Sequence, residues 1–105
     1  MVRRRFARYR VDRPLRAVLA GDKAPSLTIR GRCRVLGEGG VDAIMAELLE
    51  LGQLVSLELS PNLRVSAAVR NRRSFHYGFE FVELHDGEKL AIKRLCQSYP
   101  ASRTL

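Results

Sequence analysis

The sequence predicts an all-β protein, a six-stranded antiparallel β-barrel with a C-terminal α-helix. Short segments of alternating apolar and polar residues recur along the chain, separated by glycine, proline and asparagine turn signals. The segment with a clear helical spacing of apolar residues lies near the C-terminus. A chain of 105 residues has room for one domain with one core. Closing so small a sheet into a barrel, rather than leaving it as a sandwich, removes bare edge strands.

Two strands are expected in the first third of the chain. Residues 8–20 alternate loosely, with Pro14 as an irregularity, and residues 21–25 have the composition of a loop. Residues 26–36 alternate regularly, which is typical of a strand with one buried face and one solvated face. On this pattern the buried face carries Leu27, Ile29, Gly31, Cys33 and Val35, and the solvated face carries Thr28, Arg30, Arg32 and Arg34.

The middle of the chain continues the pattern of strands and turns. The segment Gly37–Gly40 is predicted to be a turn rich in positions that can take positive φ. The segment 47–52 has two interpretations, a short helical turn or a loop that ends at Gly52. Further strands are expected at 41–46, 54–60 and 63–70, with Pro61 and Asn62 making the turn between the last two.

The C-terminal part contains the last strand and the helix. Residues 75–81 place four aromatic side chains at a spacing of two, which favours the core face of a strand over a platform for stacking bases. We expect Asp86 to cap a helix that runs from Gly87 to about Ser98. The aromatic residues are Phe75, Tyr77, Phe79 and Phe81, and the apolar stripe of the helix consists of Ala91, Ile92, Leu95 and Cys96.

Positive charge is concentrated at the start of the chain. Residues 1–34 contain eleven Lys or Arg and two acids, a net charge of +9, whereas residues 35–105 have a net charge of −1. Sixteen of the nineteen basic residues are arginines. The planar guanidinium binds a phosphate or a guanine edge through two hydrogen bonds, which a lysine does not do. The composition therefore favours a partner that carries phosphate.

Other functional classes find no support in the residues. His76 and His85 have no further ligand at metal-binding spacing, and no serine stands in a nucleophile motif, so we expect neither a metal, nor a cofactor, nor an enzyme. Cys33 and Cys96 form no CxxC pair, and without a secretory signal they are expected to be buried free thiols. No apolar run reaches transmembrane length, so we expect a cytoplasmic protein without membrane insertion.

The candidate site combines an N-terminal arm with the glycine turn. Residues 1–8 form the arm, residues 9–99 the barrel with its helix, and residues 100–105 a tail. In a small barrel, an arm at the start of the first strand lies over the end of the second strand. Arginine side chains and exposed glycine N–H groups would together make a basic concavity for an anion. Its residues are Arg3, Arg4, Arg5, Arg8, Arg34, Gly37, Gly39 and Gly40.

From about Arg3 to Tyr99 the chain resembles the PilZ domain, a bacterial receptor domain for cyclic di-GMP. The family's RxxxR motif corresponds to Arg4 through Arg8, and the last strand, residues 77–84, is similar to the family's G-x-E-F ending. The second motif, D/N-x-S-x-x-G, falls on residues 35–40 and is degenerate. Val35 replaces the acid or amide, Gly37 replaces the serine, and only Gly40 is retained.

The resemblance implies a receptor module for cyclic di-GMP in bacterial second-messenger signalling. Arg4 and Arg8 would grip the phosphates and guanine edges, assisted by Arg3 or Arg5, and ordering of the arm would change the surface shown to a downstream protein partner. The two polar groups missing at Val35 and Gly37 would weaken binding by about 1–3 kcal/mol. This corresponds to roughly a tenfold to hundredfold loss of affinity.

Two alternatives stand beside this hypothesis. The degenerate second motif favours a PilZ-type domain that binds no nucleotide and acts as a protein-interaction adaptor in motility or pilus assembly. The basic charge by itself would also suit a general RNA- or DNA-binding barrel. Sequence-specific nucleic-acid binding is not expected, because the chain has no exposed aromatic platform in this interpretation.

Overall fold

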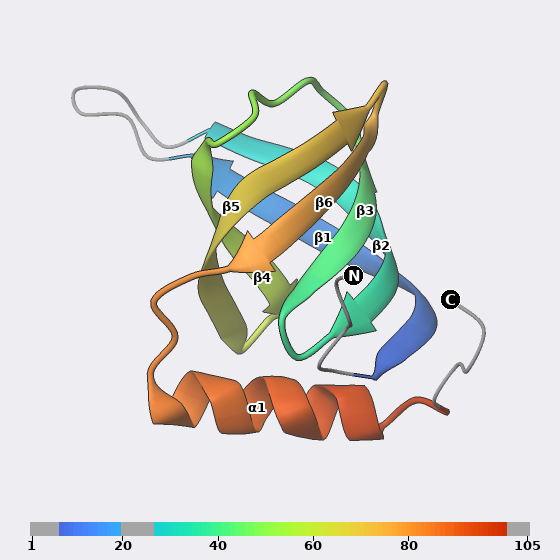
Figure 1. Ribbon diagram of the computed structural model, residues 1–105, viewed down its shortest axis with the longest axis vertical. Helices are drawn as coiled ribbons and strands as arrows, with labels where there is room; N and C mark the ends of the chain where they lie inside the picture. Colours follow the sequence, from blue (N-terminus) through green and yellow to red (C-terminus); the bar gives the residue numbers. More distant parts are fainter. Residues whose placement is uncertain (1–6, 20–26, 101–105) are drawn as a thin grey trace, which may run out of the picture.

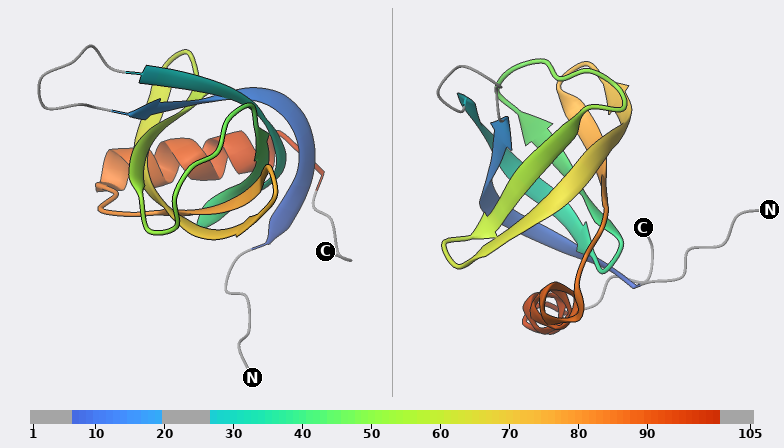
Figure 2. Two further views of the ribbon diagram at one scale, coloured as in Figure 1. Left: turned by 90° about the horizontal axis from the view of Figure 1, so that it is seen from above. Right: turned by 90° about the vertical axis from the view of Figure 1, so that its left-hand side faces the viewer.

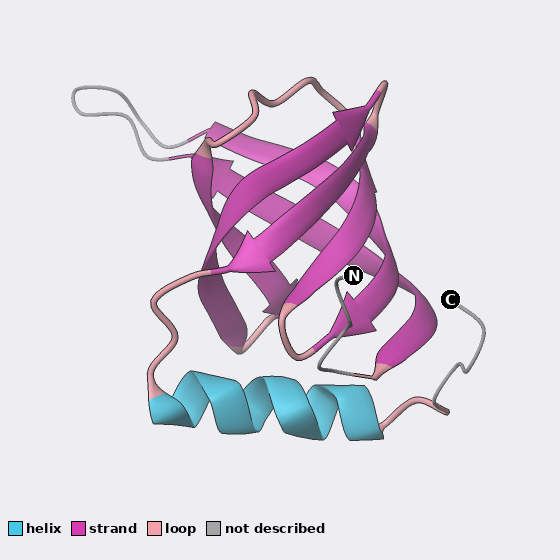
Figure 3. Ribbon diagram, viewed as in Figure 1, coloured by secondary structure: helices cyan, strands magenta, loops and turns pink. Residues whose placement is uncertain are grey.

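The computed structural model describes residues 7–19 and 27–100, and in these ranges six antiparallel strands close into a barrel with one helix (Figures 1 and 3). The strand order around the barrel is β1-β2-β3-β6-β5-β4, which confirms the predicted fold class. Residues 1–6 of the predicted arm, the loop at 21–25 and residues 101–105 of the tail lie outside the described residues. The elements are β1 (Arg8–Leu19), β2 (Leu27–Gly37), β3 (Gly40–Met45), β4 (Leu54–Ser60), β5 (Leu63–Arg73), β6 (His76–Phe81) and α1 (Asp86–Gln97).

Strand β1 closes the barrel by pairing on both of its edges. Its first residue, Arg8, stands opposite Gly37 at the end of β2. Further along, Ala17 stands opposite Ile29 in β2 and Leu57 in β4. The start of the first strand therefore lies beside the end of the second, as the sequence predicts.

A β-bulge in strand β2 changes which of its side chains point toward the core. In its pairing with β3, Arg34 is an extra residue between Cys33 and Val35, which makes a β-bulge. Beyond the bulge Leu36 is fully buried and Val35 is half-exposed, so the facing predicted for this part of the strand is wrong. Leu27, also predicted in the core, is exposed at the beginning of the strand.

The loop between β3 and β4 covers the end of the barrel opposite the helix (Figure 1). Leu49 is buried there, and its N–H donates to the Tyr77 hydroxyl at 2.7 Å. Gly52 takes a φ of +81°, and its N–H donates to the carbonyl of Val69 at 2.7 Å. This segment is therefore a loop, the second of the two interpretations left open by the sequence.

Strand β5 is longer than the sequence indicates. It passes a register shift between Val69 and Asn71 and continues to Arg73, because the bulge lets the strand bend without losing its pairing to β6. Phe75 falls in the turn between the two strands and is exposed, so its predicted core position is wrong. The other three aromatics of the pattern are in the core: Tyr77, Phe79 and Phe81.

Helix α1 lies across one end of the barrel, as the views from above and from the side show (Figure 2). Its N-cap is His85 rather than the predicted Asp86. The N–H of Glu88 donates to His85 Nδ1 at 3.2 Å, and the Glu88 carboxylate accepts the N–H of His85 at 3.1 Å, which completes a capping box. Ile92 and Cys96 are fully buried in the common core, as their helical spacing predicts.

The two cysteines are buried free thiols, as predicted. Burial raises the pKa of Cys33 to about 12 and the pKa of Cys96 to about 11. Both thiols are therefore neutral at pH 7. Within the described ranges no helix is long and apolar enough to cross a membrane, and no cluster of His, Cys, Asp and Glu is arranged to hold a metal ion.

Candidate anion-binding site

An open hollow of about 350 Å³ lies over β3 and its neighbours in the barrel. The buried residues Ala43 and Tyr77 contribute to its lining. The remaining lining residues project from β1, β2, β3, β5 and β6, and most of them are charged or polar. They are Arg8, Arg34, Asp42, Ile44, Asn71, Arg73 and His76.

The register of the strands explains why side chains so distant in sequence meet here. Residues directly opposite each other in antiparallel strands present their side chains to the same face of the sheet. Two rows of such partners cross the hollow from strand to strand. The first row is Val35, Asp42, Gly78 and Asn71, and the second is Ile44, His76 and Arg73.

Gly78 leaves a gap in the first row, and the side chain of Asn71 lies over that gap. A Cβ atom placed on Gly78 would stand 2.6 Å from Asn71 Oδ1, closer than any van der Waals contact permits. The two residues are therefore complementary. Any larger residue at position 78 would displace the Asn71 amide from this part of the hollow.

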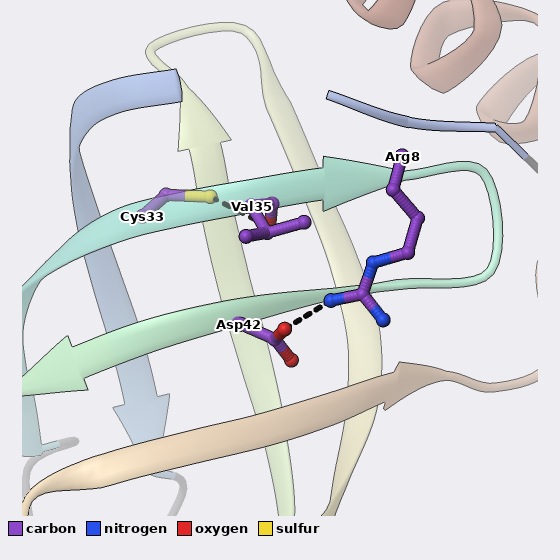
Figure 4. Close-up of polar contacts among 4 residues, drawn as sticks. All are labelled: Arg8, Cys33, Val35 and Asp42. Carbon is purple, nitrogen blue, oxygen red and sulfur yellow. Dashed lines mark hydrogen bonds and ion pairs between the residues drawn. The ribbon is translucent and has the colours of Figure 1, made fainter. Parts of the chain in front are cut away.

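An ion pair joins the start of β1 to β3 at the edge of the hollow. Arg8 reaches past the end of β2, and its Nη2 donates to Asp42 Oδ2 (Figure 4). The side chain of Arg8 is 24% exposed and that of Asp42 is 48% exposed, so solvent or a ligand reaches both. Asp42 Oδ1 has no hydrogen-bond partner among the residues that the structure describes.

The charges around the hollow favour an anion. Arg8, Arg34 and Arg73 stand against the single carboxylate of Asp42, which leaves a net charge of +2 with His76 neutral. Within the described part of the chain, neither Arg34 nor Arg73 is in an ion pair. Arginines that converge without acidic partners on one concave surface attract phosphate and offer it several hydrogen bonds.

The turn between β2 and β3 needs glycine where β3 approaches β6. A side chain at Gly40 would collide with the carbonyl of Phe79, because β3 and β6 approach closely at this point. The carbonyl of Gly39 accepts a hydrogen bond from the N–H of Phe81 at 3.0 Å. None of the three glycines takes a positive φ, and none lines the hollow. The predicted contacts of Gly37, Gly39 and Gly40 with a ligand stay a prediction.

Two of the predicted arginines, Arg8 and Arg34, line the hollow. The other three lie outside the described residues: Arg3, Arg4 and Arg5. Sequence reasoning missed the remaining polar residues of the hollow. The alternation of β3 already places Asp42 on its outward face, but nothing in the sequence pairs it with residues of β5 and β6, far along the chain. The missed residues are Asp42, Asn71, Arg73 and His76.

Comparison with known proteins gives a consistent picture. The family model described as "PilZ domain" matches residues 2–98. The PilZ domain with c-di-GMP of YcgR from Escherichia coli has a TM-score of 0.71 at 15% identity, covering 93% of this chain and 92% of that one. The PilZ domain of CeSA from a cellulose-synthesizing bacterium has a TM-score of 0.65 at 16% identity, covering 87% and 95%.

A third solved structure is the inhibitor of motility MotI/DgrA of Bacillus subtilis. It has a TM-score of 0.67 at 17% identity, covering 93% of this chain and 51% of that one, so the chain spans about half of its length. At these identities the solved structures show a common fold. No curated protein matches the chain.

Proposed function

The chain belongs to the PilZ domain family, and on that premise we propose that it is a receptor for cyclic di-GMP that binds the dinucleotide in the hollow over β3. The observation that carries the proposal is the meeting of Arg8, Arg34 and Arg73 around one concave surface. The role is that of a ligand-binding module in bacterial second-messenger signalling rather than an enzyme. The buried free thiols are compatible with a cytoplasmic location.

The chemistry of the ligand matches that of the hollow. A cyclic dinucleotide carries two phosphates, each with one negative charge, and the hollow has a net charge of +2. Its guanine bases present O6 and N7 acceptors, which the guanidinium fork of an arginine binds together. One arginine can therefore hold a phosphate while another holds a base.

We assign the principal contacts to Arg8 and, from the RxxxR pattern, to Arg4. Arg8 stands at the edge of the hollow with about a quarter of its side chain exposed, which leaves donors available for a ligand. Arg34 follows as a second contact because it projects from the bulge of β2 without an acidic partner among the described residues. A ligand held between β1, β2 and β3 would change the surface that a downstream protein partner meets.

A second function, that of a protein-interaction adaptor without a nucleotide, is favoured by a different observation. Large apolar side chains are exposed near the end of the barrel opposite α1, in the loop before β4, at the first residue of β4 and in the turn before β6. Val35 and Gly37 also lack the polar side chains of the family's second motif. The exposed apolar residues are Leu48, Leu51, Leu54 and Phe75.

A calorimetric titration with cyclic di-GMP separates the two functions. We expect saturable binding to the wild type and its loss in the double variant Arg4→Ala/Arg8→Ala. Arg64→Ala is the matched control, since Arg64 pairs with Glu58 across β4 and β5 and does not line the hollow. Absence of heat at high micromolar ligand would refute the receptor and leave the adaptor. Equal binding of any oligonucleotide with a steep salt dependence would indicate a general nucleic-acid binder instead.

A further inference from the structure

Asp42 supplies the carboxylate of the hollow, and its position in the barrel is specific. In the pairing of β2 with β3, Asp42 stands directly opposite Val35. The Cβ atoms of such partners lie about 4.5–5.5 Å apart on the same face of the sheet. The side chains of both residues are visible beside Arg8 in Figure 4. The polar group that is absent at Val35 is therefore present one strand further along the same row.

The two carboxylate oxygens of Asp42 differ in their partners. Its Oδ2 accepts from Arg8, and its Oδ1 has no partner among the described residues. The side chain is about half exposed and lines the hollow, so this second oxygen is accessible to a ligand. An ionised carboxylate acts purely as an acceptor of hydrogen bonds.

Guanine is the base that suits such an acceptor. Its Watson–Crick edge presents the N1–H and the N2 amino group side by side, two donors that a carboxylate can receive. Adenine has a single donor on that edge, the N6 amino group, beside an N1 lone pair and a C2–H. A carboxylate placed to receive the N1–H and N2 amino group of guanine would therefore face a lone pair and a C–H group in adenine. A fixed carboxylate thereby discriminates between the two purines by leaving adenine's contacts unmade.

The geometry points to Asp42 as the residue that selects guanine, accepting from the base while Arg8 holds both the carboxylate and the ligand. This inference rests on the proposed function, since it assigns a specificity residue to the same hollow. Within the described residues Asp42 is the one carboxylate that lines it. The selection would therefore come from β3 rather than from the position of Val35 in β2.

The opposite role for Asp42, that of an internal competitor which occupies Arg8 and repels phosphate, makes a different prediction. Removing a competitor tightens binding of every anion. Removing a selecting acceptor weakens binding of the guanine ligand and reduces discrimination. The charge balance favours selection, because the hollow keeps a net charge of +2 with Asp42 ionised, enough to match two phosphates.

The experiment compares the affinities for cyclic di-GMP and cyclic di-AMP in three proteins, the wild type, Asp42→Asn and Asp12→Asn. Asparagine keeps the shape of the side chain but replaces one acceptor by a donor. We expect Asp42→Asn to lower the affinity for cyclic di-GMP by about tenfold to hundredfold, since one or two hydrogen bonds to a charged group are lost. The affinity for cyclic di-AMP should stay within about twofold of the wild type. Asp12→Asn removes an equivalent carboxylate outside the hollow and is expected to change neither affinity.

The possible results distinguish the selection role of Asp42 from the proposed function as a receptor. Unchanged or tighter binding of cyclic di-GMP by Asp42→Asn would overturn the selection role while leaving the receptor intact. A wild type that binds neither ligand would instead refute the proposed function itself. A wild type that binds both ligands equally would also overturn selection, and this measurement does not depend on whether any variant folds. Restoring the carboxylate from the facing position, in Val35→Asp combined with Asp42→Ala, is expected to recover part of the discrimination.

Discussion

Two arginine–aspartate ion pairs join strands of this barrel, and they differ in their surroundings. Arg32 Nε donates to Asp12 Oδ1 at 2.6 Å, with side chains that are 52% and 69% exposed. Arg8 pairs with Asp42 at the edge of a hollow that two further arginines line, and both of its side chains are less exposed. The same two residue types thus make a solvated surface contact in one place and part of a candidate site in the other.

The difference shows that convergence, rather than the presence of arginine, distinguishes the candidate site. At the exposed pair, water competes for every donor and the charges of arginine and aspartate balance each other. In the hollow, one aspartate balances only one of three arginines, so two positive charges are left for a ligand.

The largest effect is expected from removing Arg8, the arginine of the pair in the hollow, with Arg32 of the exposed pair as the comparison. Arg8→Ala removes donors that grip a phosphate or a base through charge-assisted bonds of about 1.5–3 kcal/mol each, so we expect at least about a hundredfold loss of affinity for cyclic di-GMP. Arg32→Ala is expected to stay within about twofold. Calorimetric titration of both variants measures this. Similar losses in the two variants would mean that binding follows overall charge and not the hollow.

Cys33 separates the two regions along β2, with Arg32 of the exposed pair before it and Arg34 of the hollow after it. Burial raises its pKa from 9.0 to about 12, so its contribution to stability is complete below about pH 9 and is lost as the pH rises toward 12. At pH 10 the loss is about 1.4 kcal/mol in the free energy of unfolding. Urea unfolding at pH 8, 9 and 10 measures it. Cys33→Ala should remove this part of the pH dependence, and an unchanged slope would contradict the assignment.

The other arginines of the hollow are expected to have intermediate effects. Arg34→Ala and Arg73→Ala should each weaken the binding of cyclic di-GMP by about threefold to tenfold, because each removes one contact at an open surface where water competes, and such a contact contributes about 0.5–1.5 kcal/mol. Arg70→Ala is the control, since Arg70 pairs with Glu80 at 2.7 Å on the neighbouring surface of β5 and β6 and does not line the hollow. Binding isotherms give the three affinities. A loss in Arg70→Ala as large as in Arg73→Ala would extend the site beyond the hollow.

The smallest effect is expected at the exposed pair itself. The hydrogen bond from Arg32 holds the pKa of Asp12 below its ordinary value of 3.8. An NMR titration of the Asp12 carboxyl should show this low pKa, and Arg32→Ala should raise it toward 3.8. A lowered carboxyl pKa adds stability above the ordinary value that is lost as the pH falls through the lowered one. Because the Asp12 side chain is largely exposed and water competes for its partner, we expect no resolvable change of Tm in Asp12→Asn at pH 7.

Local patterns in the sequence were sufficient to predict where the strands and the helix lie and most of the side chains that they bury. Alternation over 54–60 and the spacing of Ile92 and Cys96 report directly on which side chains face the core, because burial repeats with the period of each element. The predictions that proved wrong fall where a bulge, a turn, a strand end or a helix cap interrupts the period. The bulge at Arg34 reversed the facing of Val35 and Leu36, and His85 took the capping position predicted for Asp86.

Periodicity and composition were enough to predict a small barrel with a basic N-terminal part and to place the start of the first strand beside the end of the second. Which side chains meet on the outer surface of the barrel depends instead on how the strands pair. Asp42 faces Val35 and Gly78 through strand register, which depends on bulges and on the closing of β1 against β4. Those pairings join residues distant in sequence, and a one-residue slip in any of them would turn a different set of side chains outward.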